Sequence, residues 1–419
     1  MKNMLHQFRS NQEPVHTRKH EIAIYLFLAL TSIILGLIFY TVDNYSEVFQ
    51  LVNKKPLSPV TQNHENPNQS KTKLMHRETI GFLPSWSIAQ NAIVHTEYLD
   101  QIIYFGIGID ETGTLMKIDN EGNELIEWKY FRGNEFKNIR KSAEQTNTKI
   151  LIAIKNFDNV SIDTLISSDS NRNRAVLQIS RLVDDYDLDG VNIDFEYFTQ
   201  IDFPTMKFYN QFLQELSTSL KETNSESIIS VDVNATAVYQ DNAYDMVKIG
   251  DVVDQVIVMG YDFHRPISTR AGPVAPLDSE GDTPSLSQTI NSLRGRVESN
   301  KVILGIPLYG YEWQTYTIDY ASKTVPDSGA VATYKRVREL LTNRDDLQLS
   351  YDPLSQSPRI TYFQNGLIKQ IYYEDDKSIQ KKLEFIKENE LAGVALWTLG
   401  YEGDYIDPWN IIKDFRKTK

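Results

Sequence analysis

The chain has 419 residues, of which 41% are hydrophobic and 11% aromatic, a composition typical of a folded protein with a large core. Its formal net charge of −13 argues against a nucleic-acid-binding face, which needs a basic patch, and against binding of anionic lipid by the main domain. The absence of cysteine excludes disulfides, thiolate nucleophiles and cysteine metal sites, but it does not fix the compartment.

The amino-terminal part of the chain has the pattern of a membrane anchor. Residues 1–21 are polar and partly basic, and residues 22–42 then run without a charge for long enough to span a bilayer. A cleaved signal peptide, the alternative, has a shorter apolar region and small residues at its cleavage site. We therefore expect a single-pass membrane protein with a cytoplasmic amino terminus and the main domain outside the cytoplasm.

A tether and a folded domain are predicted to follow the anchor. Residues 43–78 are rich in Asn, Gln, Ser, Lys and Pro and show no sustained periodicity, as is typical of a flexible linker. From Thr79 onward, short apolar runs alternate with amphipathic stretches. The runs predicted as strands are 80–83, 101–105, 149–154, 190–195, 227–233, 255–259, 301–306 and 392–397, and the stretches predicted as helices include 174–186, 205–221, 285–298 and 378–389.

This alternation favours a parallel sheet with covering helices. Eight such units in residues 79–419 fit an α/β fold of the (β/α)8 TIM barrel type better than an open doubly wound sheet. About eighty residues separate the seventh run from the eighth, which is more than a barrel loop needs. They hold a helical pattern at 333–341 and two strand-like runs joined by Asn365-Gly366, a strong hairpin signal. We expect a small α+β insertion over about residues 311–376, forming one wall of a cleft.

Residues 189–196 read Asp-Gly-Val-Asn-Ile-Asp-Phe-Glu and end the fourth predicted strand. In a strand, Asn192, Asp194 and Glu196 face one side and the apolar residues between them face the other. Buried carboxylates are unfavourable unless they are hydrogen-bonded or used in chemistry. Since barrel active sites lie at the carboxyl ends of the strands, we interpret this row as a catalytic floor.

Other predicted strand ends bring acids and aromatic rings to the same mouth. They are Trp86 after the first strand, Met259-Gly260-Tyr261-Asp262 at the sixth, Tyr309-Gly310-Tyr311-Glu312-Trp313 after the seventh and Trp397 at the eighth. Carboxylates surrounded by aromatic rings suit a carbohydrate, whose C–H faces stack on indole while its hydroxyls form hydrogen bonds.

These motifs resemble those of the family 18 glycoside hydrolases, the chitinase family. Residues 189–196 are similar to its Asp-x-x-Asp-x-Asp-x-Glu signature, 259–262 to its Met-x-Tyr-Asp segment, and 305–310 to its seventh strand. Trp397 matches the tryptophan that floors the −1 sugar site. The resemblance covers most of residues 79–419. It implies retaining hydrolysis of β-1,4 linkages next to N-acetylglucosamine, in peptidoglycan or chitin-like polysaccharide.

The resemblance also implies the roles of the site residues. In this family the 2-acetamido carbonyl of the substrate attacks the anomeric carbon. Glu196 would be the general acid and base, Asp194 would hydrogen-bond the amide N–H, and Tyr261 would hold the acetamido oxygen. The expected substrate-binding residues are Asp262, Trp397, Tyr309, Met259, Asn192 and Trp86. No metal or cofactor is implied, and His264 is more simply interpreted as a polar loop residue.

Two positions depart from the family pattern. The family has an acid at position 192, and this acid shares a proton or hydrogen bond with the central aspartate. Asn192 cannot ionise. We therefore predict that the pH profile of activity is shifted and that activity is not lost. The third strand, which in the family usually ends in Ser-x-Gly-Gly, here ends in residues 153–156, Ala-Ile-Lys-Asn. Asn192 and the segment 272–275 are similar to bacterial cell-wall and spore-cortex N-acetylglucosaminidase members.

The sequence leaves two other interpretations open. A non-catalytic, lectin-like protein on the same scaffold would bind glycan without turnover, although inactive relatives usually lose the acid that Glu196 supplies. A buried ion-pair network could account for one acidic motif alone, but not for matching signals at several strand ends.

Overall fold

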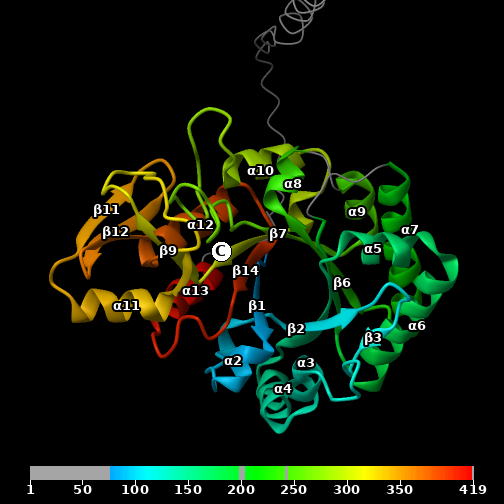
Figure 1. The fold of residues 1–419 in the computed structure, drawn as a ribbon. Coiled ribbons are helices and arrows are strands. Elements are labelled where there is room, and N and C mark those ends of the chain that lie inside the picture. Colours follow the sequence, from blue (N-terminus) through cyan, green and yellow to red (C-terminus); the bar gives the residue numbers. More distant parts are fainter. Residues whose placement is uncertain (1–75, 198–202, 241–243, 418–419) are drawn as a thin grey trace, which may run out of the picture. The chain divides into compact units, whose positions relative to one another are not determined.

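A computed structural model describes residues 76–197, 203–240 and 244–417 (Figure 1). The predicted amino-terminal segment, membrane anchor and most of the tether lie outside the described residues. Within the described ranges, no helix is both long and apolar enough to cross a bilayer.

A closed barrel of eight parallel strands forms the centre of the described part of the chain (Figure 1). The strands are β1 (Glu78–Pro84), β2 (Gln101–Ile109), β4 (Lys149–Asn156), β5 (Gly190–Phe195), β6 (Ile228–Asn234), β7 (Gln255–Met259), β8 (Val302–Pro307) and β14 (Gly393–Trp397). The barrel closes because β1 pairs with both β14 and β2. A two-residue strand, β3 (Leu115–Met116), runs antiparallel to the end of β2. The (β/α)8 prediction and all eight predicted strands are confirmed.

Helices cover the outside of the barrel (Figure 1). They are α2 (Ser85–Ala89), α3 (Ile126–Arg132), α4 (Asn134–Thr146), α5 (Asn159–Ser167), α6 (Asp169–Asp185), α7 (Phe203–Thr223), α8 (Ala235–Gln240), α9 (Met246–Val252), α10 (Leu286–Leu293), α12 (Asp376–Glu388) and α13 (Asp407–Lys417). Two short 3-10 turns are η1 (Thr96–Tyr98) and η2 (Ser299–Lys301). Three of the amphipathic stretches predicted as helices fall in α6, α7 and α12. The stretch predicted at 285–298 is helical only to Leu293, because Gly295 takes a positive φ of 75° that ends the helix.

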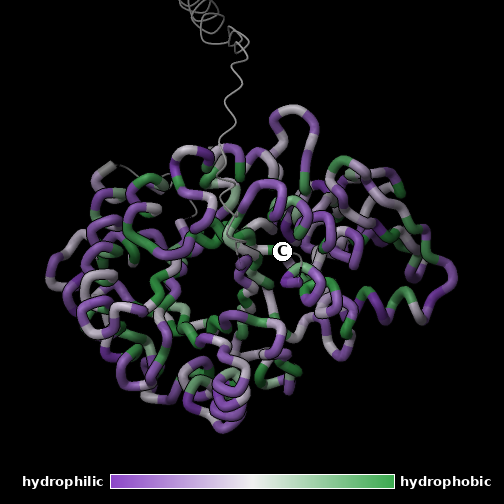
Figure 2. Tube along the Cα trace, turned by 180° about the vertical axis from the view of Figure 1, so that it is seen from behind, coloured by the Kyte–Doolittle hydropathy of each residue, from purple (hydrophilic) through white to green (hydrophobic). Residues whose placement is uncertain are grey.

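Side chains alternate along the barrel strands between two buried clusters. Val191, Ile193 and Phe195 of β5 lie in the larger cluster, where Phe195 stacks on Phe212 of α7 with ring centroids 5.5 Å apart. The opposite face of β5 points into the barrel and carries the polar residues. Figure 2 shows the matching pattern over the molecule, with hydrophobic segments along the barrel strands and hydrophilic segments on much of the outer helices and loops.

The insertion between β8 and β14 is a separate antiparallel sheet beside the barrel (Figure 1). It consists of β9 (Tyr309–Thr315), β10 (Ala330–Thr333), α11 (Tyr334–Asn343), β11 (Gln348–Asp352), β12 (Ser357–Gln364) and β13 (Leu367–Tyr372). The predicted hairpin joins β12 to β13, and Asn365 and Gly366 take the positive φ values of 52° and 77° that a tight turn requires. The sheet has five strands, so the insertion is larger than the two predicted runs. Because β9 begins directly after β8, its first residues lie at the barrel mouth.

Candidate active site

The acidic row of β5 lies inside the barrel and rises toward its carboxyl end. Asn192 and Asp194 are 0% and 2% exposed. Lys155 of β4 is the register partner of Asp194. The backbone N–H of Glu196 donates to the carbonyl of Asn156 over 3.1 Å, which extends the strand direction one residue past β5. This backbone bond keeps Glu196 at the mouth directly above Asp194.

A cavity of about 370 Å³ opens at the carboxyl ends of the strands. Its lining side chains come from the ends of most barrel strands and from the first strands of the insertion. They are Trp86, Phe105, Lys155, Phe157, Asp194, Glu196, Asp232, Asn234, Met259, Tyr261, Asp262, Arg265, Tyr309, Tyr311, Val331, Trp397 and Tyr401. The barrel topology therefore brings together every predicted site residue except Asn192.

Asn192 lies below the cavity and does not line it. Its Nδ2 atom donates to Ser230 Oγ over 3.1 Å and to Asp232 Oδ1 over 2.9 Å, both on the neighbouring strand β6. The side chain is fully buried, and both hydrogen bonds use its Nδ2 atom. Asn192 therefore lies beneath the cavity in this structure, and its predicted substrate-binding role stays a prediction.

Burial raises the pKa values of the acids at the base of the cavity. The pKa of Glu196 rises to about 7, chiefly because burial disfavours its charged form; Arg265 lowers this pKa and Asp262 raises it. The pKa of Asp194 rises well above its usual value through burial and through the negative charges of Asp232 and Glu196, against which Lys155 acts weakly. Glu196 therefore carries a proton through a substantial part of the neutral pH range, as a general acid must.

Asp262 is held at the cavity wall by two tyrosines. Its Oδ1 atom accepts hydrogen bonds from the hydroxyls of Tyr309 and Tyr311, the latter over 2.7 Å. The backbone of Asp262 takes a φ of 61°, which is uncommon for a residue other than glycine and tolerated best by Asp and Asn. The two hydrogen bonds hold the carboxylate against the cavity while this backbone turn redirects the chain.

Aromatic rings form the floor around Trp397. Its ring centroid lies 6.4 Å from that of Tyr261 in a nearly stacked arrangement, 4.8 Å from Phe105 and 6.4 Å from Trp86. Burial raises the pKa of Tyr261 well above its usual value, so its hydroxyl keeps its proton and can donate a hydrogen bond. The cavity thus combines flat apolar surfaces with a small number of convergent polar groups, as a carbohydrate site requires.

The sequence prediction missed several residues that the structure brings to the cavity. Asp232 is the most buried of these, at 2% exposure, and Asn234 and Arg265 are half-buried. A signal for two of them was present, since Ser230, Asp232 and Asn234 alternate with valines along β6 in the same way as the acidic row of β5.

Within the described ranges, one group of three side chains has the spacing of a metal site, and none of the three lines the cavity. His76, Glu78 and Asp100 bring ligand atoms within 4.8 Å of one another at the start of β1. The carboxylate of Asp100 already accepts Arg416 Nη2 over 2.9 Å and the backbone N–H of Thr79 over 2.8 Å. This group is therefore accounted for by its protein contacts.

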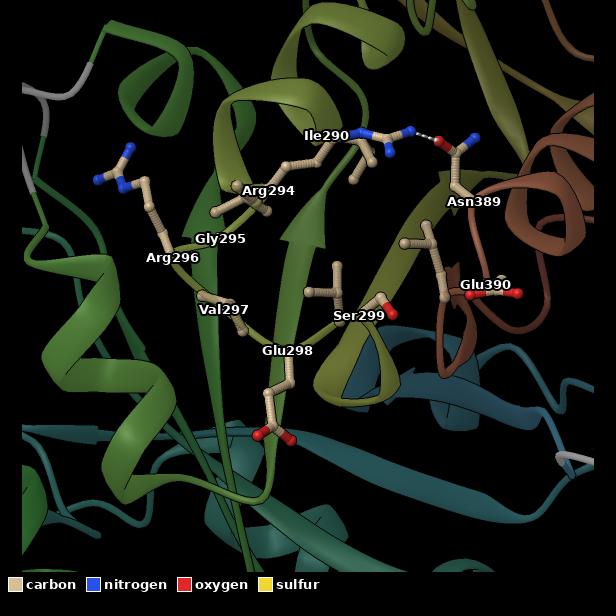
Figure 3. A pocket seen from close by; sticks show the side chains of 12 residues that line it. Ile290, Arg294, Gly295, Arg296, Val297, Glu298, Ser299, Asn389 and Glu390 are labelled. Atoms are coloured by element: carbon tan, nitrogen blue, oxygen red, sulfur yellow. Dashed lines mark hydrogen bonds between the residues drawn. The ribbon is translucent and has the colours of Figure 1, made fainter. Parts of the chain in front are cut away.

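A second cavity, of about 470 Å³, lies beside the amino ends of β8 and β14 (Figure 3). Its lining residues are Ile290, Leu293, Arg294, Gly295, Arg296, Val297, Glu298, Ser299, Val302, Asn389, Glu390 and Leu391. Figure 3 shows Arg294 directed at Asn389, to which it donates over 2.7 Å. This cavity has no aromatic ring and its acids are exposed. Although it is larger, the chemistry favours the cavity at the carboxyl ends.

A TIM barrel with buried acids and aromatic rings at its carboxyl end has the form of a carbohydrate-active protein. The model of the Glycosyl hydrolases family 18 matches residues 78–402, and the chain belongs to this family.

Relatives of known name include bacterial spore proteins. The chain is 28% identical over 267 residues to the putative sporulation-specific glycosylase YdhD of Bacillus subtilis (strain 168), covering 62% of this chain and 58% of the relative. It is 26% identical over 289 residues to the cortical fragment-lytic enzyme of the same organism, covering 66% of this chain and 62% of the relative. The chain thus spans less than two thirds of the length of these two relatives.

Solved structures confirm the fold. The Bacillus cereus spore cortex-lytic enzyme SleL superposes with a TM-score of 0.64 at 19% identity, over 81% of this chain and 74% of that one. The Ostrinia furnacalis Group IV chitinase superposes with a TM-score of 0.70 at 17% identity, over 81% of this chain and 99% of that one.

Proposed function

We propose that this protein is a retaining glycoside hydrolase that cleaves β-1,4 linkages next to N-acetylglucosamine by substrate-assisted catalysis. The observation that carries the proposal is the placement of Glu196 and Asp194 at the base of an aromatic-lined cavity, with the pKa of Glu196 raised to about 7. The names of the relatives, which include cortical fragment-lytic enzymes and chitinases, favour cortex peptidoglycan or a chitin-like glycan as the substrate.

In the first step, Glu196 donates its proton to the glycosidic oxygen. The carbonyl oxygen of the 2-acetamido group attacks the anomeric carbon as the bond to the leaving alcohol breaks, which gives an oxazolinium ion. Asp194 accepts a hydrogen bond from the acetamido N–H and balances the positive charge that develops on the ring. The leaving alcohol departs with the proton from Glu196.

In the second step, Glu196 acts as a base. It removes a proton from water, the water oxygen attacks the anomeric carbon, and the acetamido group is restored. Two inversions at the same carbon retain the β configuration. The hydroxyl of Tyr261 donates to the acetamido oxygen and orients it for attack, and Trp397 stacks beneath the sugar ring.

Release of reducing ends tests this function. Wild-type protein is expected to release them from chromogenic chito-oligosaccharides or purified peptidoglycan, and Glu196→Gln to be slower by about 10³-fold because it removes the proton donor and base. A matched control is Glu298→Gln, at the exposed acid of the second cavity, which should leave the rate unchanged. Absence of product from either substrate with the wild type, or equal rates for wild type and Glu196→Gln, would contradict the enzyme assignment.

A non-catalytic glycan-binding protein is the alternative function. Titration of N-acetylglucosamine oligomers by calorimetry separates the two, because a lectin-like protein binds the oligomers and returns them uncut. Binding by both wild type and Glu196→Gln, with no product from either, would favour the lectin.

We also propose that residues 22–42 anchor the protein in a membrane, with residues 1–21 in the cytoplasm and the catalytic domain outside. The uncharged run and the basic residues before it support this arrangement. Protease added to intact cells should remove the domain and spare the amino-terminal segment. A soluble form that begins after residue 42 would instead indicate a cleaved signal peptide.

A further inference from the structure

Asp232 is the acid in the site to which no role has been given. It lies on β6, is 2% exposed and reaches the base of the cavity. Asn192 pairs in register with Ser230, so Asp232, two residues farther along β6, lies at the level of Asp194 on β5. Asn192 Nδ2 holds the Asp232 carboxylate by a hydrogen bond of 2.9 Å.

Three carboxyl groups therefore share one buried space. Burial is the main cause that raises the pKa of each of the three. The negative charges of Asp232 and Glu196 raise the pKa of Asp194 further, and at Asp232 the hydrogen bond from Asn192 lowers the pKa while the charge of Glu196 raises it. The other titratable or charged groups that face them are Lys155 on β4, Tyr209 on α7, Tyr244 before α9, and Tyr261, Asp262 and Arg265 after β7. Two cations against four acids leave the space short of positive charge, so full ionisation is unfavourable.

The hydrogen-bond pattern also indicates a missing donor. Asn192 Oδ1 and Asp194 Oδ1 are both buried, and neither has a hydrogen-bond partner among the described residues. Both are acceptors when Asp194 is ionised, whereas a protonated carboxyl group gains an O–H donor. Buried polar atoms are rarely left unpaired, and a proton on one of these carboxyl groups supplies a donor to a cluster that is short of donors.

We propose that Asp194 and Asp232 hold one proton between them in the free protein, and that Asp232 is the positioning residue for Asp194. The family pattern has this second acid on β5, at position 192. In this protein, Asp232 supplies it from β6. Asn192 fixes the Asp232 carboxylate in place. When substrate binds, the shared proton stays on Asp232, and Asp194 is left ionised to accept the acetamido N–H. This catalytic part rests on the proposed function; the shared proton itself does not.

Asp232→Asn is the variant that tests the proposal, since it removes the charge and keeps both the size and an oxygen that accepts from Asn192. Without the negative charge of Asp232, Asp194 ionises at a lower pH. We expect the acidic limb of the pH profile of kcat to move down by about 1 unit. We expect kcat at its optimum to fall by roughly tenfold, the ratio that one pKa unit represents, with KM little changed.

The exchange variant Asn192→Asp/Asp232→Asn supplies the rescue. It places the acid on β5 and the amide on β6, so an acid and an amide still face each other across the two strands, with their positions exchanged. We expect both kcat and the acidic limb to move back toward wild type. A purely structural role for Asp232 would not be rescued in this way, because the acid is then absent from β6.

A readout that needs no activity keeps the two proposals separable. Acids whose folded pKa is raised above the unfolded value bind more protons in the folded state, so stability falls as pH rises from the unfolded pKa toward the folded one. The decrease in Tm from pH 5 to pH 8 should be smaller in Asp232→Asn than in wild type. The difference should be on the order of 2 °C for each unit by which the substitution reduces the pKa rise of the buried acids. The exposed Asp345→Asn is the matched control and should follow wild type.

Equal Tm losses in wild type and Asp232→Asn, with superimposable acidic limbs, would overturn the shared proton. If the wild type cuts no glycan, the proposed function fails, and the Tm comparison still decides on the proton. If Asp232→Asn does not fold, the exchange variant decides alone: a Tm loss like that of wild type supports the proposal, and a flat pH dependence contradicts it.

Discussion

Two regions of this molecule bury acidic side chains, and they differ in whether a basic side chain pairs with the acid. At the edge of the insertion, Glu374 is fully buried and pairs with the equally buried Lys382 of α12 over 2.7 Å. Burial raises the pKa of Glu374 and Lys382 counteracts that rise. At the barrel mouth, by contrast, no described basic side chain forms a salt bridge with Asp194, Glu196 or Asp232, and Lys155 pairs instead with Glu127 over 3.6 Å.

The difference separates a structural acid from a functional one. A buried acid with its own cation is compensated within the fold, whereas buried acids without one hold protons at a pH where carboxyl groups are normally ionised. The molecule therefore has the means to neutralise a buried carboxylate and does so at Glu374. Variants of the two regions should accordingly affect different properties.

The largest expected effect is on stability, from Lys382→Met. It leaves Glu374 buried without its cation, and we expect a loss of about 3–5 kcal/mol in the free energy of unfolding, with kcat unchanged in the protein that remains folded. Urea unfolding measures the loss. The neighbouring Lys381→Met removes only a partly exposed pair with Glu384 and should have no measurable effect on the free energy of unfolding. Equal effects of the two variants would remove the distinction between the regions.

Asp194→Asn should have the opposite signature. The change removes a buried charge that is not paired, so the fold should be as stable as wild type or more stable above pH 7. The charge that stabilises the oxazolinium ion is lost, and we expect kcat to fall by about 10²–10³-fold. Steady-state kinetics and thermal unfolding of the same preparation measure both. A large loss of stability with an unchanged rate per folded molecule would place Asp194 with the structural acids.

The alkaline limb of the pH profile should report Glu196. Because Glu196 must be protonated to donate, and its pKa is raised to about 7, kcat/KM should fall as pH rises through that value. Arg265 lowers this pKa, so Arg265→Gln should move the limb upward, by about 1 unit. Arg270→Gln is the matched control, since Arg270 donates to the carbonyl of Ala321 and does not line the cavity. A downward shift with Arg265→Gln would contradict this assignment.

The smallest expected effect comes from Tyr309→Phe. It removes one of the two hydrogen bonds to Asp262, and Tyr311 retains the other. A loss of about 1 kcal/mol in transition-state stabilisation, or roughly fivefold in kcat/KM, is expected. The double variant Tyr309→Phe/Tyr311→Phe should lose more transition-state stabilisation than the sum of the single variants, because the Asp262 carboxylate then has neither hydrogen-bond partner. Strict additivity in a double-mutant cycle would mean that the two bonds act independently.

The sequence predicted much of the barrel and its mouth, and the reasons for its failures are physical. Apolar runs and acids at strand ends are local patterns, so the strands and the row at Asp194 and Glu196 were found. Asp232 was missed although it alternates with valines along β6, because a single acid in an apolar strand does not by itself indicate a site. Its partner, Asn192, lies 40 residues earlier and becomes adjacent only when β5 and β6 pair. The five-stranded insertion was underestimated because its edge strands are short and depend on pairing with β9 and β12.

The most direct test of the proposed mechanism is the anomeric form of the first product, followed by proton NMR during cleavage of an N-acetylglucosamine oligomer. Attack by the acetamido group followed by water gives two inversions, so the β-anomer should form first and then equilibrate with the α-anomer. Initial formation of the α-anomer would mean that water attacks directly. In that case the roles given to Asp194 and Tyr261 would be wrong.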